Sequence, residues 1–402
     1  MPTEPSHMRR QIDVVLNGTR IPIDEAVFTV LLENSVAANY SDYKKALESS
    51  SITFDSLVAL ARTGDIPYVL FFAPRPMAEA QVKSKTEKLL AGVTKEIFAV
   101  NSRDRVHLRD IELIVKDLLR KQELLKKNDS TLIRNRIVGL LSRPGRTPEE
   151  DAAKLMEALG LSHGAIRVAR SKADALEVVT ARLEANQILV SRGVPNAMPQ
   201  NLTKLKGNFS GMAIRDAKVP YIFLAGGNRG DSQEPAGRML FTLVLMAVLV
   251  AKKKFMPVTY DGSSAGTDIG PEYDIVGAIL MPAETLRGLS LGVLDDVKAA
   301  AEVLQVTPSA IAVRAMRLGM ISPAAADDHL QELRLEFSQR PKSQARSLAT
   351  VKAVRRYNGR EFSRRMLDVL DAGRISRGEF CRVVCLRRIR PHQINAFREA
   401  VQ

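Results

Sequence analysis

The feature that most constrains this chain is an apolar run of thirteen residues, Met239–Ala251, in which Thr242 is the only polar side chain. A helix needs about 20 apolar residues to cross a bilayer, so this run is too short to span one. Arg238 precedes it and Lys252–Lys254 follow it, as is typical of the polar ends of a helix. The run therefore predicts a helix that is buried on all sides in the core of a globular domain.

Short segments on both sides of this run stand in an order that resembles one known family. Arg238–Leu243 matches the pattern R-x-x-F-T-L, and Val219–Leu224 has the character of the strand before it. The other matches are Phe209–Asp216 (F-x-G-x-x-x-x-D), Ile279–Pro282 (similar to L-L-M-P) and Val306–Ser322 (similar to V-S-x-x-A…R-L-x-x-L-G-L-I-S). Over residues 150–325 the ordered set resembles the ImmA/IrrE zinc metallopeptidases. The resemblance implies a zincin-like α+β domain.

The departure from the family pattern lies at its active site. The family carries H-E-x-x-H on one helix, where two histidines at i and i+4 bind zinc and the glutamate polarises the metal-bound water. Those positions here are Leu245, Met246 and Leu249, which can neither ligate zinc nor take up a proton. Glu272 and Asp274 lie near the position of the family's third ligand, but neither is cleanly in register. The resemblance therefore implies a pseudopeptidase.

The rest of the sequence offers no substitute site. The five histidines never pair at ligand spacing; they are His7, His107, His163, His329 and His392. The glycine-rich stretch Ala225–Asp231 lacks the G-K-[ST] ending of a phosphate loop and favours a plain turn, and Gly262–Gly266 favours a flexible loop. We expect no metal, no cofactor and no catalytic residue.

Two cysteines, Cys381 and Cys385, are four residues apart in a segment with helical character. They lack further zinc ligands, and a disulfide would need an oxidising compartment. We expect two thiols on one helix face. Because no signal peptide or membrane span is evident, the expected compartment is the cytoplasm.

The net charge of +14 is concentrated near the C-terminus. Residues 340–402 hold 16 Lys and Arg against 5 Asp and Glu, and 14 of the 16 are arginine. The planar guanidinium fork suits phosphate groups, so we nominate Arg382, Arg387, Arg388 and Arg390 as nucleic-acid-binding residues. Two alternatives stay open, namely a solvated helical face and an interface with an acidic protein.

Residues 9–76 are expected to be helical with short loops. Thr53 has the character of a helix cap, and Gly64 of the end of the same helix. Ile66–Pro74 resembles the end of the Xre-type helix-turn-helix domain that often precedes an ImmA/IrrE domain.

The recognition helix of such a domain would be Ser41–Ser49, where Lys44 and Lys45 are the candidate DNA contacts. Asp42 and Glu48 stand in the same segment, which contains no arginine or glutamine to read bases. A DNA reader and a degenerate domain kept for packing or dimer contact both stay open.

The fold class expected from these patterns is α+β and mainly helical. Asp110–Lys127 has the spacing of an amphipathic helix, and Thr147 before Pro148 predicts the start of another. The chain is divided into a disordered start (1–8), a degenerate Xre-like helix-turn-helix domain (9–76), a helical connector (77–146), the pseudopeptidase domain (147–325) and a basic helical C-terminal domain (326–402).

The resemblance implies a non-catalytic regulator of a phage or other mobile element, because active relatives cleave Xre-type repressors. Such a protein binds a repressor or another protein partner, with DNA as a further ligand, and a homo-oligomer is compatible with the sequence. The alternatives are a DNA-binding transcriptional regulator and a toxin or peptidase whose active site has gone unrecognised.

Overall fold

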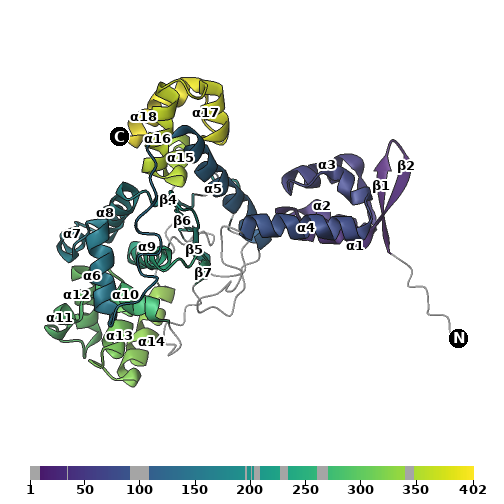
Figure 1. The fold of residues 1–402 in the computed structure, drawn as a ribbon. Helices are drawn as coiled ribbons and strands as arrows, with labels where there is room; N and C mark the ends of the chain where they lie inside the picture. Colours follow the sequence, from purple (N-terminus) through teal and green to yellow (C-terminus); the bar gives the residue numbers. More distant parts are fainter. Residues whose placement is uncertain are drawn as a thin grey trace. The chain divides into compact units, whose positions relative to one another are not determined.

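The computed structural model describes residues 10–33, 35–90, 108–194, 197–200, 202, 209–226, 234–259, 270–339 and 348–402. The expected disordered start, the loop at 262–266 and most of the stretch 225–231 lie outside them. The protein is α+β and mainly helical, with two small mixed sheets, as expected (Figure 1). It forms two compact units, an N-terminal unit of residues up to 90 with 108–116 and a C-terminal unit from residue 117 onward. No helix among the described residues is long and apolar enough to cross a membrane.

The N-terminal unit contains a three-stranded sheet of order β2-β1-β3. β1 (Gln11–Leu16) and β2 (Thr19–Asp24) form an antiparallel hairpin, and β3 (Ser51–Thr53) pairs with β1 in parallel. Asn17 and Gly18 make the turn with φ of 49° and 81°, the left-handed pair that an Asn-Gly hairpin turn requires. The N-terminal domain was expected to be helical with short loops, and this expectation missed the sheet because it overlooked the turn between two alternating segments.

The helices of the N-terminal unit contribute to a mostly aliphatic core that also contains Phe28, Tyr43 and Phe71. These helices are α1 (Glu25–Glu33), η1 (Val36–Asn39), α2 (Ser41–Ser49), α3 (Phe54–Thr63), η2 (Tyr68–Phe72) and α4 (Arg75–Leu90). Phe28 stacks on Tyr43 with a centroid distance of 5.6 Å, which joins α1 to α2. The expected helix at 41–49 is confirmed as α2, and Thr53 and Gly64 cap α3 as expected. The assignment to a helix-turn-helix class stays a prediction.

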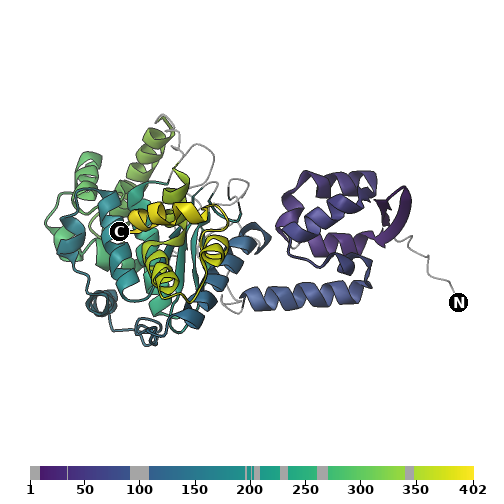
Figure 2. The same ribbon diagram turned by 90° about the horizontal axis from the view of Figure 1, so that it is seen from above.

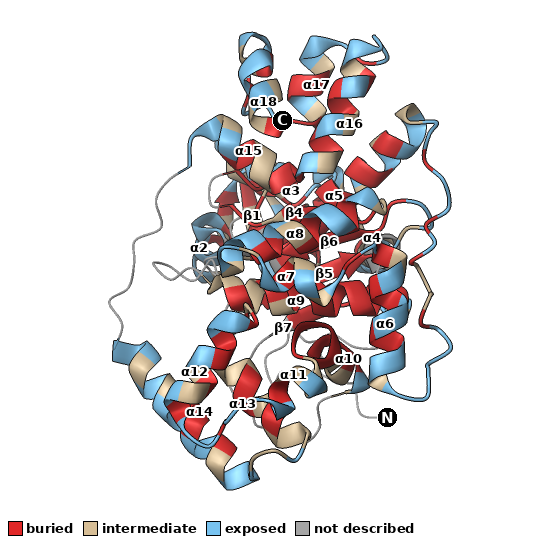
Figure 3. Cartoon of the chain, turned by 90° about the vertical axis from the view of Figure 1, so that its left-hand side faces the viewer, coloured by how far each residue is buried: buried red, intermediate tan, exposed pale blue. Residues whose placement is uncertain are grey.

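A four-stranded sheet of order β4-β6-β5-β7 forms the centre of the C-terminal unit. Its strands are β4 (Leu189–Arg192), β5 (Phe209–Ile214), β6 (Tyr221–Leu224) and β7 (Pro257–Thr259). The apolar run is confirmed as helix α9 (Ala236–Ala251), which packs against β5, β6 and α8. Every residue of α9 from Thr242 to Ala251 is buried, and Figure 3 shows buried residues concentrated in α9, α10 and the sheet.

Eight further helices extend this core, and the part of α5 (Leu108–Asn128) from Asp117 onward belongs to the same unit. They are α6 (Pro148–Leu159), α7 (His163–Arg167), α8 (Lys172–Ala185), α10 (Pro271–Leu280), α11 (Ala283–Arg287), α12 (Leu294–Val303), α13 (Pro308–Arg317) and α14 (Pro323–Gln339). Thr147 is the N-cap of α6 as expected, and its hydroxyl accepts a hydrogen bond from the Glu150 N–H at 3.2 Å. The boundaries expected after residues 76 and 325 fall inside α4 and α14.

The C-terminal helices gather beside β4 in the same unit (Figures 1 and 2). They are α15 (Thr350–Asn358), α16 (Arg360–Asp371), α17 (Arg377–Val383), η3 (Pro391–Gln393) and α18 (Ile394–Val401). Tyr221 of β6 donates to the Asn358 carbonyl at 2.7 Å, and the Asn358 amide donates to the Val384 carbonyl at 2.9 Å. Cys381 and Cys385 are free thiols and both are buried. The expectation that they share one helix face is wrong, because α17 ends at Val383, before Cys385.

Candidate functional site

The three residues at the family's zinc and catalytic positions lie on α9 inside the main core. Leu245, Met246 and Leu249 are 2%, 0% and 1% exposed. They belong to a core cluster of mostly aliphatic side chains, to which α6, α8, α10 and the sheet also contribute. An apolar environment of this kind leaves a charged ligand group without solvation.

The two carboxylates near the family's third ligand position are already bound by cations. Glu272 is 5% exposed, and its Oε1 lies 2.6 Å from Lys254 Nζ and 3.4 Å from Lys252 Nζ. Burial raises the pKa of Glu272, but the hydrogen bond from Lys254 and the Lys252 charge outweigh burial, so that the pKa lies below its ordinary value. Asp274 accepts two hydrogen bonds from Arg317, at 2.8 and 2.5 Å. These residues do not fit a zinc ion.

Within the described ranges, no three His, Cys, Asp or Glu side chains come together as possible metal ligands.

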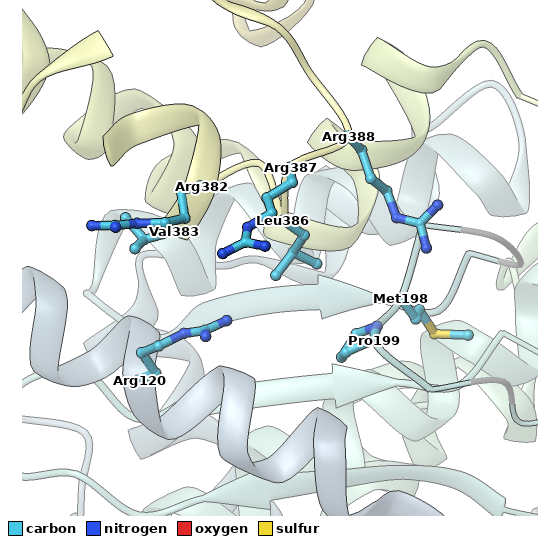
Figure 4. Close-up of a pocket in the computed structure, with 8 residues that line it drawn as sticks. All are labelled: Arg120, Met198, Pro199, Arg382, Val383, Leu386, Arg387 and Arg388. Atoms are coloured by element: carbon cyan, nitrogen blue, oxygen red, sulfur yellow. The ribbon is translucent and has the colours of Figure 1, made fainter. Parts of the chain in front are cut away.

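The nominated arginines lead to a different site in the C-terminal unit. A pocket of about 520 Å³ is lined by Arg120, Met198, Pro199, Arg382, Val383, Leu386, Arg387 and Arg388 (Figure 4). We call it the arginine pocket. None of these lining residues is acidic, and four are arginines. Figure 4 shows the Arg120 and Arg387 side chains extending into the space between α5 and the segment after α17.

The chain after α17 is held in a turn that carries two of these arginines. Leu386 and Arg387 both adopt left-handed backbone conformations, with φ of 52° and 61°. This conformation costs a non-glycine residue roughly 1–2 kcal/mol. The turn is closed by hydrogen bonds from the Arg387 and Arg388 N–H groups to the carbonyls of Cys381 (2.8 Å) and Cys385 (2.9 Å). Strained backbone of this kind is typical of sites that position a functional side chain.

Ion pairs separate the C-terminal arginines into two groups. The first group pairs within the unit: Arg364 with Glu361 at 2.7 Å, Arg365 with Asp129 at 2.6 Å and Arg398 with Asp371 at 2.7 Å. The charges of these arginines are therefore already neutralised by carboxylates within the unit, so these residues are not candidates for binding a ligand.

The second group contains the four nominated arginines. Arg382, Arg387, Arg388 and Arg390 are exposed and form no ion pair with any described residue. Three of them line the arginine pocket, whereas Arg390 does not. The structure therefore leaves these four guanidinium groups available to an anionic partner.

Lys44 and Lys45 are exposed on α2 in the N-terminal unit and are not part of the arginine pocket. Asp42 and Glu48 are exposed on the same helix, so its accessible charges balance. A helix whose positive and negative charges balance attracts phosphate more weakly than a surface whose charges are all positive. The arginine pocket is the stronger candidate.

Sequence reasoning missed Arg120, Met198 and Pro199, which complete the arginine pocket. Arg120 lies on the amphipathic helix α5, is half-exposed and pairs with the buried Asp117. Its position in the sequence carries no signal, because the pocket joins segments about 80 and 260 residues apart. Comparison with protein-family models, curated proteins and solved structures finds no match for this chain.

Proposed function

We propose that this chain is a non-catalytic regulator in which a metallopeptidase-like scaffold carries an arginine pocket that binds DNA phosphates. The observation that carries the proposal is the set of guanidinium groups in one pocket without a carboxylate among the lining residues. The positive charges of these groups repel one another until an anion binds among them and offsets the repulsion. With DNA as ligand, the proposed place of action is the cytoplasm.

Contacts between the resembling segments support the scaffold part of the proposal. Gly237 of α9 approaches the backbone before α13, where an added Cβ would lie 3.0 Å from the Val306 carbonyl carbon. Gly277 of α10 lies under Arg314 of α13, and a Cβ there would be 2.8 Å from its Cδ. The residues that carry the resemblance therefore form one packed core. The proposed link to a phage or mobile element rests on the resemblance alone.

The chemistry of the arginine pocket favours the DNA backbone over base edges. Guanidinium groups bind phosphate oxygens through paired hydrogen bonds, and Met198 and Leu386 offer apolar surface for sugar rings. The described residues that line the pocket include no asparagine or glutamine, the side chains that usually read adenine. Phosphate contacts position a protein on DNA without specifying its sequence.

Replacing Arg387, Arg388 and Arg390 with alanine is expected to weaken binding to all DNA sequences alike. Each phosphate contact releases counterions and contributes about −0.9 to the slope of log affinity against log salt concentration. The triple variant should therefore have a shallower slope, by up to about 3. Fluorescence anisotropy with duplex DNA across a salt series measures both effects.

The matched control replaces Arg20, Arg364 and Arg398, which removes the same charge from ion pairs outside the arginine pocket. Its slope should stay close to that of the wild type. If the wild type binds no DNA at low salt, or if both triple variants change the slope equally, the arginine pocket is not a DNA site. The protein-partner function then takes its place.

An exposed apolar surface on the N-terminal unit favours that second function. Tyr68, Val69 and Phe72 of η2 and Met77 of α4 are 45%, 56%, 42% and 55% exposed. Large apolar side chains that gather within one short segment are typical of protein interfaces. A repressor or another protein partner is the proposed occupant, and the same surface is compatible with a homo-oligomer.

The purified protein is expected to contain substoichiometric zinc and to leave an Xre-type repressor uncleaved. The reason is chemical, because leucines occupy the ligand positions and Lys254 and Arg317 bind the nearby carboxylates. Elemental analysis after chelator-free purification measures the metal, and gel electrophoresis follows the repressor. About one tightly bound zinc per chain would contradict the proposal and favour an unrecognised peptidase site.

A further inference from the structure

A second pocket of about 310 Å³ lies between α8, β4 and the junction of α15 with α16. All of it belongs to the C-terminal unit, and it shares no lining residue with the arginine pocket. We call it the α8–α15 pocket. Four arginines line it, Arg192, Arg355, Arg356 and Arg360, together with Glu177 and Glu184.

Two of these arginines already have partners. Arg192 pairs with Glu177 at 2.5 Å and donates to the Thr180 hydroxyl at 3.0 Å. Arg360 donates to the Val401 carbonyl at 3.0 Å and to the Gln402 carbonyl. These contacts fix the walls of the α8–α15 pocket and neutralise one guanidinium charge.

Arg355 and Arg356 form no ion pair with any described residue, and the Nε atom of each is buried without a hydrogen-bond partner in the described chain. Burial lowers the pKa of Arg356, and the neighbouring Arg192 charge lowers it further. A half-buried cation beside another cation is unfavourable unless an anion joins them. The Glu177 carboxylate opposes this lowering of the pKa, but it is paired with Arg192, so neither Arg355 nor Arg356 has an ion-pair partner of its own among the described residues.

Glu184 adds a polar group at the inner end of the pocket. It is 6% exposed, and its Oε2 accepts a hydrogen bond from the Glu361 N–H at 3.3 Å. Its Oε1 is buried and has no hydrogen-bond partner among the described residues. Burial raises the pKa of Glu184 to about 7, and the N–H of Glu361 opposes this shift. Near neutral pH, Glu184 is therefore in part an O–H donor.

Gly359 makes this approach of α16 to β4 possible. Its φ is +85°, and an added Cβ would lie 2.2 Å from the Val190 carbonyl oxygen and 3.0 Å from Glu184 Oε1. Only glycine fits here, so the first turn of the twelve-residue helix α16 stands beside Glu184 and the arginines. A helix N-terminus favours anions and adds to the positive field of the pocket.

We propose that the α8–α15 pocket binds the phosphate group of a phosphomonoester, with Arg355 and Arg356 as its charge partners and Glu184 as a hydrogen-bonding group. The two negative charges of a phosphate dianion balance the two guanidinium groups that have no ion-pair partner. Its oxygens accept hydrogen bonds from both groups. The volume of about 310 Å³ leaves room for the group to which the phosphate is attached. This inference does not depend on the DNA proposal, because the two pockets are separate.

Isothermal titration calorimetry of the full chain with inorganic phosphate and with sulfate tests the site. The Arg355→Ala, Arg356→Ala double variant should lose at least about tenfold in affinity for both anions. The matched control is the Arg364→Ala, Arg398→Ala variant, whose arginines are paired with carboxylates outside both pockets and which should bind both anions like the wild type. Circular dichroism melting of each variant establishes that it is folded.

Two further probes distinguish the sources of a phosphomonoester. Ribose 5-phosphate represents a free metabolite, and an oligonucleotide with or without a 5′-phosphate represents a nucleic-acid end. Tighter binding of either phosphorylated probe than of its unphosphorylated counterpart supports the site and identifies its source. If the wild type binds neither phosphate nor sulfate, or if the double variant binds them equally well, the proposal is overturned.

Glu184 gives the site a pH dependence that a purely structural arginine cluster lacks. The titratable groups around it are Glu177, Arg192, Tyr221, Arg355, Arg360 and Glu361. Sulfate does not titrate near neutrality, so its affinity should fall several-fold between about pH 6 and about pH 8 as Glu184 ionises. In Glu184→Gln the fall should disappear. An equal fall in both proteins would overturn the role of Glu184.

Discussion

Replacing Leu245 and Leu249 together with histidine is expected to lower the free energy of unfolding by about 2–6 kcal/mol. Both leucines are at most 2% exposed, on one face of α9. A neutral imidazole carries one donor and one acceptor, and the aliphatic neighbours offer partners for neither. Each buried ring without partners costs roughly 1–3 kcal/mol, and the double variant combines the two costs.

Thermal melting in the presence of a chelator measures this loss, at about 2–4 °C per kcal/mol for a domain of this size. The matched control is Leu245→Met, Leu249→Met, which keeps the volume and should cost under about 1.5 kcal/mol per site. An unchanged melting temperature for the histidine variant would contradict the buried position of α9. Stabilisation of that variant by added zinc would show that the two imidazoles share one face of α9 at ligand spacing.

Sequence patterns predicted best where a segment's own residues decide its structure. The apolar run specified α9, and the cap at Thr147 specified the start of α6, because both signals are local. The expected strand segment Val219–Leu224 contains β6, which begins two residues later, at Tyr221. Hydrophobic spacing fixes the type of an element more firmly than its ends.

The candidate sites were predicted only in part, because they depend on which segments meet. The charge pattern identified Arg382, Arg387 and Arg388, but nothing in the sequence placed Arg120 opposite them. The α8–α15 pocket was missed entirely. Three of its four arginines, Arg355, Arg356 and Arg360, belong to the C-terminal segment whose basic residues the sequence could not distinguish from one another. The ion pairs that neutralise Arg364 and Arg398 became visible only in the fold. A count of charges in the sequence cannot tell which cations are paired in the fold and which are free to bind an anion.

Replacing Asp117 with asparagine is expected to cost about 3–5 kcal/mol of stability. Asp117 is 3% exposed, and its Oδ2 lies 2.9 Å from the Nζ of Lys121, which is 0% exposed. The Nζ is not aligned for a good hydrogen bond, so the attraction is chiefly ionic. Tyr357 donates to the same carboxylate at 2.8 Å, and its ring centroid lies 4.0 Å from Nζ. Asparagine preserves the shape and an acceptor but leaves the Lys121 charge buried without an anion.

Denaturant unfolding of Asp117→Asn measures the loss of stability, and two further variants identify its cause. Asp117→Asn with Lys121→Met should recover most of it, because no buried charge then lacks a partner. Asp371→Ala, which breaks the exposed pair with Arg398, should cost only about 0.2–1 kcal/mol.

The pH dependence of Asp117→Asn gives an independent check on the same cause. Burial lowers the pKa of Lys121, and loss of the Asp117 charge lowers it further. The unfolded chain then binds more protons than the folded one, so the stability of Asp117→Asn should rise with pH toward the ordinary lysine pKa of about 10.4. A loss that is independent of pH and remains in the double variant would show that Asp117 acts through packing rather than charge.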